Sequence, residues 1–378
     1  MTTPDRTTAT RSPQQSPLHA CHERQGARFV TFGGWQMPVE YAGGGVLSEH
    51  AAVRTAAGVF DVSHLGTVRV SGPGAMSWLN TVLANDLGRL RPGSAQYQLL
   101  CTERGGVVDD LIAYLLADDE LLLVPNAANC AQVAQILRDL APRGIEVADE
   151  HGRHAIIAVQ GPSSPALLES LGLPTQMEYM SFATAALAGV PLSVCRSGYT
   201  GERGYELIVD AGRAEGIWLA VLSAGAPLGA RPCGLGARDT LRTEMGYALH
   251  GHELSLEIDP VSAGLSWAIG WDKPRFRGRE ALVEIRSAGP ARRLRALRAS
   301  GRAIPRGGMH CFAADQGPGS PSLGTVTSGT YSPSLRVGIG LAYLDAHVQP
   351  GQHVGIQVRS RLEDFEVVKP PLWPSRVH

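Results

Sequence analysis

The chain has 378 residues, of which 44% are hydrophobic and 18% charged, so its length suggests two or three domains and its composition excludes disorder for most of the chain. The formal net charge of −1 gives no global basic field for nucleic acid or an anionic membrane. No apolar run reaches the length of a membrane span, and no secretory signal opens the chain. We therefore expect a cytoplasmic protein that binds neither nucleic acid nor membrane.

Residues 1–17 are polar, contain prolines and lack a hydrophobic period, so they are predicted to form a disordered tail. From Leu18 onward helical and strand patterns alternate. Helices are predicted near residues 48–58, 73–83, 131–140, 165–171, 214–222 and 235–247, and strands near 67–70, 107–116, 121–124 and 155–159. After about Arg286, runs such as LGTVTSGTY and VGIGLAYL indicate a small all-β domain. The expected class is α+β, with a body over residues 18–285 and a C-terminal domain over residues 286–378.

The basic and sulfur-containing residues limit the chemistry further. Only Lys273 and Lys369 among the 34 basic residues are lysines, and neither has the sequence surroundings of a desolvated Schiff-base lysine, so no pyridoxal phosphate is expected. The six cysteines form no C-x-x-C pair and are predicted to be free thiols. HACHE from residue 19 and HGHE from residue 250 lack a second ligand pair at zinc spacing, so no metal site is expected.

Two groups of acidic residues are candidates for function. Asp109 and Asp110 are neighbours in a predicted strand, where successive side chains point to opposite faces. One of them is therefore expected to enter a pocket and the other to be solvated or to cap a turn, so that they form no acid–base dyad. Glu202 and Glu206 flank Gly204 in a segment that returns into a strand.

Aromatic residues leave two interpretations open from composition alone. They could form a stacking pocket for a planar ligand, or they could be core residues. The residues are Trp35, Tyr97, Tyr114, Tyr199 and Trp267.

Several long motifs follow one another over nearly the whole chain. They are FGGWQMPVEY (32–41), FDVSHLG (60–66), AQYQLLCTERGGVVDDL (95–111), LLVPNAAN (122–129), GYTGERGYE (198–206), GLGARDTLRTEMGYALHGHEL (234–254), AGLSWAIG (263–270), GRAIPR (301–306) and GTVTSGTYSPSL (324–335). Together they resemble the glycine cleavage system T-protein family, the tetrahydrofolate-dependent aminomethyltransferases. The resemblance implies a three-lobed folate-binding body of two mixed α/β lobes, completed by a small C-terminal β-barrel.

The resemblance also implies a reaction and its residues. The family transfers the one-carbon unit from the aminomethyl-dihydrolipoyl arm of H-protein to tetrahydrofolate, releasing ammonia. Asp110 corresponds to the catalytic aspartate, and Glu206 to the carboxylate that accepts two pterin donors. Arg238 is expected to pair with Glu206 or with a folate carboxylate. The full set of implied folate-binding residues is Tyr97, Tyr114, Val124, Asn126, Tyr199, Glu206, Arg238, Trp267 and Arg376.

Two related functions remain as alternatives. One is a folate-dependent demethylase acting on N-methyl amino acids, but such chains usually carry a flavin domain for which this sequence shows no fingerprint. The other is a non-enzymatic folate-binding paralogue that assists iron–sulfur cluster assembly. Its K-G-C-x-x-G-Q-E signature is replaced here by RSGYTGE at residues 196–202. For the T-protein reading, six arginines within residues 292–306 suggest a surface that steers an acidic H-protein.

Overall fold

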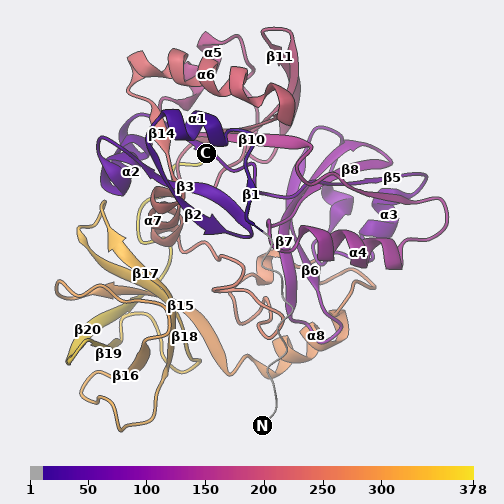
Figure 1. The fold of residues 1–378 in the computed structure, drawn as a ribbon. Coiled ribbons are helices and arrows are strands. Elements are labelled where there is room, and N and C mark those ends of the chain that lie inside the picture. The colour runs from indigo at the N-terminus through magenta and orange to yellow at the C-terminus, as the bar shows by residue number, and fades with distance from the viewer. Residues whose placement is uncertain (1–11) are drawn as a thin grey trace, which may run out of the picture.

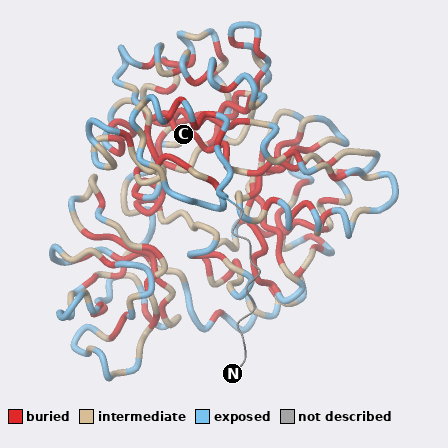
Figure 2. Tube along the Cα trace, viewed as in Figure 1, coloured by how far each residue is buried: buried red, intermediate tan, exposed pale blue. Residues whose placement is uncertain are grey.

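Three sheets and a closed barrel organise the computed structural model, which describes residues 12–378 (Figure 1). The expected α+β class with a C-terminal barrel is confirmed. Buried residues concentrate inside each lobe, while the outer turns are exposed (Figure 2). No helix within the described range is long and apolar enough to cross a membrane.

The first lobe is a six-stranded sheet with helices on both faces. Its strand order is β11-β12-β13-β10-β4-β14. One face of the sheet packs against α5 and α6 in a core that includes Val159, Leu207 and Trp218. The other face packs toward α7 in a second core that includes Phe60 and Leu241. The elements are β4 (Gly58–Asp61), β10 (His154–Gln160), α5 (Ser164–Ser170), β11 (Phe182–Leu187), β12 (Val190–Cys195), β13 (Gly204–Asp210), α6 (Ala214–Gly225), β14 (Arg231–Cys233), α2 (Gly45–Thr55) and α7 (Leu235–Met245).

The second lobe is a five-stranded sheet in the order β6-β7-β8-β5-β9. The predicted hairpin near residues 107–124 forms its centre, because apolar residues such as Leu111 and Leu123 bury one face against α3 and α4. The elements are β5 (Val68–Ser71), α3 (Ala75–Leu79), β6 (Ala95–Cys101), β7 (Val107–Ala117), β8 (Glu120–Val124), α4 (Cys130–Leu140) and β9 (Glu146–Asp149).

Lys273 binds the backbone of a loop in this lobe, and its surroundings differ from those expected from the sequence. It is buried, and burial lowers the pKa of its ammonium group to about 8. The lysine is therefore desolvated, contrary to the interpretation from sequence. Its Nζ donates hydrogen bonds to the carbonyls of Leu83 at 2.6 Å and Asn85 at 2.8 Å, which explains how a charged group is accommodated there.

The N-terminal segment is ordered from earlier than predicted. Of the predicted tail, residues 1–11 lie outside the described residues. Gln14–Gln15 form β1, which pairs in parallel with β3 (Trp35–Tyr41) beside β2 (Ala27–Phe32) and α1 (His19–Arg24). Ser16 is buried and donates to Asp61, whose carboxylate also contacts His22 Nε2 at 2.8 Å. The prediction of disorder is thus wrong for residues 14–17, because this tertiary network supplies partners that the local sequence does not reveal.

The C-terminal domain is a closed barrel in the order β15-β18-β17-β16-β19-β20. Its core is small and aliphatic around Phe365. The helix α8 (Arg279–Ala288) crosses the expected boundary at residue 285/286, and the first barrel strand begins at Arg292. The strands are β15 (Arg292–Ala299), β16 (His310–Ala313), β17 (Gly324–Ser332), β18 (Val337–Asp345), β19 (His353–Val358) and β20 (Arg361–Val368).

A buried carboxylate, Glu244 on α7, ties the barrel to the body. It pairs with Arg54 Nη2 at 2.6 Å, and it accepts hydrogen bonds from Ser332 Oγ at 2.5 Å and Ser334 Oγ at 2.9 Å. Burial alone raises its pKa, but hydrogen bonds and charges from His50, Arg54 and Ser332 outweigh burial and hold the pKa at about 2. The ionised form is therefore the one that the folded state stabilises.

We predict that Glu244 makes folding acid-sensitive. Its folded pKa of about 2 lies below the ordinary value of 4.5, so its contribution is complete above that value and is lost as the pH falls toward 2. The free energy of unfolding should differ between wild type and Glu244→Gln by an amount that shrinks by roughly 3 kcal/mol on acidification. Denaturant unfolding at several pH values measures this. The exposed Glu284→Gln serves as control, and a difference independent of pH would contradict the prediction.

Candidate active site

The side chain of Asp110 lies on the face of β7 that looks away from α3 and α4. Tyr97 on the neighbouring strand β6 shares that face, and its hydroxyl donates to Asp110 Oδ2 at 2.9 Å. Burial raises the pKa of the Asp110 carboxyl, although the hydrogen bonds from Tyr97 and Asn126 and the charge of His250 act in the opposite direction. The structure thus places the predicted catalytic aspartate in a desolvated position with a phenolic donor.

Of the two alternatives predicted for the second acid, Asp109 shows the turn-capping one and not the solvated one. It is fully buried, and it accepts hydrogen bonds from the turn after β8, from the backbone N–H of Asn126 at 2.9 Å and from Asn129 Nδ2 at 2.7 Å. Asn126 Nδ2 lies 2.9 Å from both Asp109 Oδ1 and Asp110 Oδ1. The register that pairs Ile112 with Val124 continues past the end of β8 and brings Asn126 opposite Asp110. Alternation along β7 directs the two side chains to opposite faces. The side-chain amide of Asn126, just after β8, nevertheless donates hydrogen bonds to both carboxyl groups.

The coupling of the two carboxyls has an electrostatic consequence. Burial and, next, the charge of Asp110 raise the pKa of Asp109 to about 8. Two carboxylates that share one site cannot both ionise easily. Burial therefore disfavours the ionised form of both carboxyls, and a charged Asp110 further opposes ionisation of Asp109.

A second cluster joins the two lobes around Glu206 on β13. Ser197 Oγ donates to Glu206 Oε2 at 2.5 Å. Tyr114 on β7 is buried in the same apolar cluster as Cys195, and burial followed by the charges of Cys195 and Glu206 raises the pKa of its phenol. Val124 at the end of β8 lies in this cluster too. Strands from two sheets thus pack in one apolar cluster beside this carboxylate.

Arg238 on α7 stacks on an aromatic ring. Its guanidinium carbon lies 4.7 Å from the centroid of Tyr199, and the Tyr199 hydroxyl donates to the Ala248 carbonyl. Within residues 12–378 it forms no ion pair with Glu206. Burial lowers the pKa of the Arg238 guanidinium, and the charge of Glu206 acts in the opposite direction. Its Nη1 is buried without a hydrogen-bond partner in the described part of the chain. A buried guanidinium N–H that donates to no protein group is suited to bind a hydrogen-bond acceptor on a ligand.

The two remaining predicted residues, Trp267 and Arg376, have exposed side chains. Trp267 is 65% exposed, and its ring stacks on Tyr97 with centroids 5.4 Å apart and planes inclined by 26°. Arg376 has an exposed side chain, and its backbone N–H donates to the Gly201 carbonyl at 2.7 Å. The C-terminal segment therefore lies along the loop that follows Tyr199.

Sequence reasoning missed three neighbours of these residues. Asn129 holds Asp109, Ser197 holds Glu206, and His250 Nε2 lies 3.3 Å from the Val107 carbonyl. His250 is part of HGHE, where histidine spacing drew attention to metal binding instead. Over residues 12–378 no group of three or more metal-ligating side chains converges.

Comparisons with known proteins agree over most of the chain. The family model described as the GCVT N-terminal domain matches residues 18–273, and that of the glycine cleavage T-protein C-terminal barrel domain matches residues 292–373. The aminomethyltransferase of Parafrankia sp. (strain EAN1pec) is 57% identical over 95% of this chain and 97% of its own length. That of Mycobacterium tuberculosis (strain ATCC 25618 / H37Rv) is 53% identical over 94% and 95%, respectively.

A solved structure gives the same answer for the fold. The crystal structure of glycine cleavage system aminomethyltransferase T from Bartonella henselae superposes with a TM-score of 0.90 at 33% identity, covering 97% of this chain and 99% of that one. Lobes, barrel and relatives together define an enzyme of the aminomethyltransferase class. The chain belongs to the glycine cleavage T-protein family. The demethylase and iron–sulfur alternatives are not favoured.

We predict that Asp109→Asn destabilises the protein. An amide nitrogen in place of Oδ2 cannot accept the backbone N–H of Asn126, which would stay buried and unpaired. The free energy of unfolding should fall by about 1–3 kcal/mol in denaturant titration. Asp118→Asn at the exposed hairpin turn is the control and should change it by less than about 0.5 kcal/mol. Equal behaviour of the two variants would show that Asp109 is not held as described.

Proposed function

We propose that this enzyme transfers the methylene group of aminomethyl-dihydrolipoyl H-protein to tetrahydrofolate. The products would be 5,10-methylenetetrahydrofolate, ammonia and dihydrolipoyl H-protein. The observation that supports this most is the buried Asp110–Tyr97 pair together with Tyr199, which is close enough to feel the charge of Asp110 and whose ring carries the Arg238 guanidinium. Such a site offers an acceptor, a donor and a charge stabiliser for one planar, hydrogen-bonding substrate.

The proposed roles follow from hydrogen-bond chemistry. A pterin presents a ring N–H and an exocyclic NH₂ side by side, and the Glu206 carboxylate accepts both. The unpartnered Nη1 of Arg238 donates to an acceptor of the folate. Tyr97, Tyr114, Asn126, Tyr199 and the rim residue Trp267 would line the site, with Val124 beneath and Arg376 at the edge of the C-terminal segment.

The proposed chemistry places positive charge beside Asp110. When the carbon–nitrogen bond of the S–CH₂–NH₂ group breaks, ammonia leaves and the carbon becomes a sulfur-stabilised cation, which one folate nitrogen attacks. When the carbon–sulfur bond then breaks, the thiol leaves and the carbon becomes an iminium on that nitrogen, which the second folate nitrogen attacks. Two N–H protons leave the folate, one with ammonia and one with the released thiol. A fixed carboxylate stabilises the cationic carbon because it needs no reorganisation in a desolvated site. The folate nitrogens are themselves the nucleophiles, so we propose neither a metal nor pyridoxal phosphate for this step.

We also propose that the arginine-rich segment recognises H-protein, although fewer of its arginines are free of ion pairs than the sequence suggested. In the arginine-rich segment, Arg292 pairs with Asp345 at 3.3 Å and Arg298 with Glu366 at 2.6 Å. These pairs reduce the local net charge. Steering of an acidic H-protein would therefore depend on the exposed Arg293, Arg302 and Arg306, which form no ion pair within the described residues.

Reconstitution tests the proposed reaction directly. The purified enzyme is mixed with aminomethylated H-protein and tetrahydrofolate, and methylenetetrahydrofolate and ammonia are both quantified. Equimolar formation of both products is expected. Folate binding without either product would contradict the proposal and favour a non-enzymatic folate-binding role.

We predict that Asp110→Asn lowers kcat by about 10²-fold, the scale of losing one preorganised charge at a transition state. The substitution keeps the side-chain shape, so the tetrahydrofolate affinity and the unfolding midpoint should change little. Steady-state kinetics and calorimetry measure the two effects. A loss of affinity as large as the loss of kcat would place Asp110 in ground-state binding instead.

We predict that Glu206→Gln weakens tetrahydrofolate binding by roughly 1.5–3 kcal/mol, the range for a hydrogen bond to a charged group. The glutamine amide would oppose a donor of the pterin with another donor. Isothermal titration calorimetry measures the change, and Glu284→Gln on α8 is the control. Unchanged affinity of the Glu206 variant would rule out this role.

A further inference from the structure

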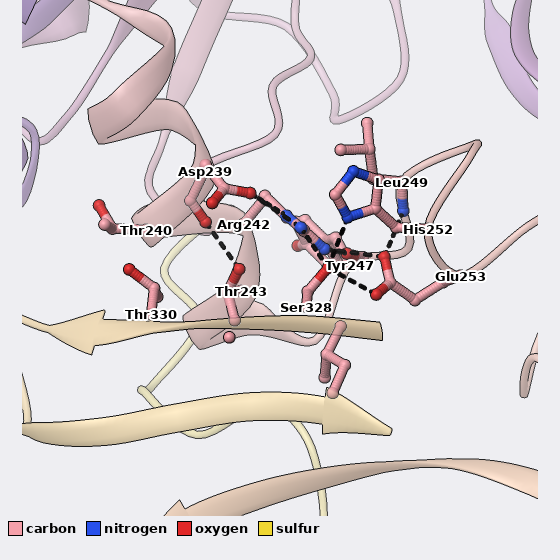
Figure 3. A network of polar contacts seen from close by, with 12 residues as sticks. Asp239, Thr240, Arg242, Thr243, Tyr247, Leu249, His252, Glu253, Ser328 and Thr330 are labelled. Carbon is pink, nitrogen blue, oxygen red and sulfur yellow. Dashed lines mark hydrogen bonds and ion pairs between the residues drawn. The ribbon is translucent and has the colours of Figure 1, made fainter. Parts of the chain in front are cut away.

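A buried ion pair joins the body to the barrel beside the site (Figure 3). Arg242 on α7 is 1% exposed, and its Nη1 donates to Glu253 Oε2 at 2.9 Å while its Nη2 donates to Ser328 Oγ on β17 at 2.7 Å. Glu253 is also fully buried. Removing one member of such a pair leaves the other charge buried and unpaired, so the geometry is strongly held.

A bulge in the barrel strand β17 completes the coordination of Glu253. Thr327 Oγ1 and Ser328 Oγ both donate to Glu253 Oε1, at 2.5 and 2.7 Å. Neighbouring residues of a regular strand point to opposite faces and could not share one acceptor. The pairing of β17 with β18 shifts register between Val326 and Ser328, and this extra residue aims both hydroxyls at the same oxygen.

The ion pair fixes the loop of residues 246–254 on either side of Ala248. Arg242 Nη1 donates to the Tyr247 carbonyl at 3.2 Å, and the Leu249 N–H donates to Glu253 Oε2 at 3.0 Å. The residues on both sides of Ala248 thus form backbone hydrogen bonds with the Arg242–Glu253 pair. The Ala248 carbonyl in turn accepts a hydrogen bond from the Tyr199 hydroxyl.

Tyr199 connects this loop to the site. Its ring lies 5.6 Å from that of Tyr247 and supports the guanidinium of Arg238, whose Nη1 has no partner in the described residues. We infer that Arg242 and Glu253 are positioning residues: through the 246–254 loop and Tyr199 they hold Arg238 toward the folate, so that the barrel bulge at Thr327–Ser328 is part of the binding machinery. This inference rests on the proposed function of the site as a folate site.

The strand β17 offers a matched pair of substitutions. Ser328 and Ser332 are both buried, and each donates to a buried glutamate of the body. The Ser332 partner, Glu244, is bonded to Arg54 and Ser334 rather than to the 246–254 loop. Ser328→Ala and Ser332→Ala therefore remove the same group from two barrel contacts. Only the first leads to the Tyr199 hydroxyl, whereas the second leads through Arg54 to the Thr200 carbonyl.

The expected result separates folate binding from stability. Ser328→Ala should raise the calorimetric Kd and the KM for tetrahydrofolate roughly fivefold, the scale of one lost hydrogen bond, without changing the KM for H-protein. Ser332→Ala should lower the unfolding midpoint and leave the Kd for tetrahydrofolate unchanged. Equal changes of Kd in both variants, or no change in either, would overturn the positioning role.

A double-mutant cycle tests the route through Tyr199. If the bulge acts through the Tyr199 hydroxyl, Ser328→Ala should change the Kd by less than about twofold in a Tyr199→Phe background. Fully additive effects would overturn the inference. Calorimetry needs no H-protein, so the two proposals are distinguishable. A wild type that binds tetrahydrofolate but transfers no aminomethyl group contradicts the proposed function, whereas a Ser328-specific loss of affinity still supports the positioning role.

Discussion

Burial of carboxylates at the junctions between lobes is the constraint on which the rest of this structure depends. A buried charge without partners costs several kcal/mol, so each such carboxylate must be neutralised or keep its proton. Glu244 and Glu253 are neutralised by Arg54 and Arg242, and hydroxyls of barrel strand β17 donate to both carboxylates. Asp109 receives amide donors and no cation, and its pKa rises to about 8. Arginine partners thus keep buried glutamates ionised at the lobe junctions, while the amide donors of Asp109 only partly offset the burial that raises its pKa.

The site is consequently a product of assembly rather than of one lobe. Asp110 and Tyr97 come from the second sheet, Glu206 from the first, and Arg238 from the helix that also carries both barrel contacts. The loop after α7 joins these parts, since Tyr199 donates to its backbone. Displacement of the barrel would therefore reach the Tyr199–Arg238 stack even though the barrel supplies neither residue.

Local pattern predicted several elements well because their burial is periodic. The helices near residues 131–140 and 165–171 and the hairpin around residues 107–124 match α4, α5, β7 and β8. Predictions of environment were less successful. Asp109 was expected either in solvent or at a turn, and it is buried at a turn. Gln14–Gln15 were expected in a disordered tail, and Lys273 was not expected to be desolvated. In each case the deciding partners come from elsewhere in the chain or from a turn after the next strand.

The sequence by itself determined the family, the α+β class and the order of the motifs, because these are recorded in residue identity and short-range periodicity. Strand alternation separated Asp109 from Asp110, and the family resemblance pointed to Asp110 as the candidate catalytic residue. Only the tertiary structure decided how Asp109 is held, that Arg238 keeps an unpartnered N–H, and which barrel hydroxyls contact Glu253. The physical reason is that hydrogen bonds and desolvation depend on groups brought together over long separations, such as Ser328 and Glu253, 75 residues apart.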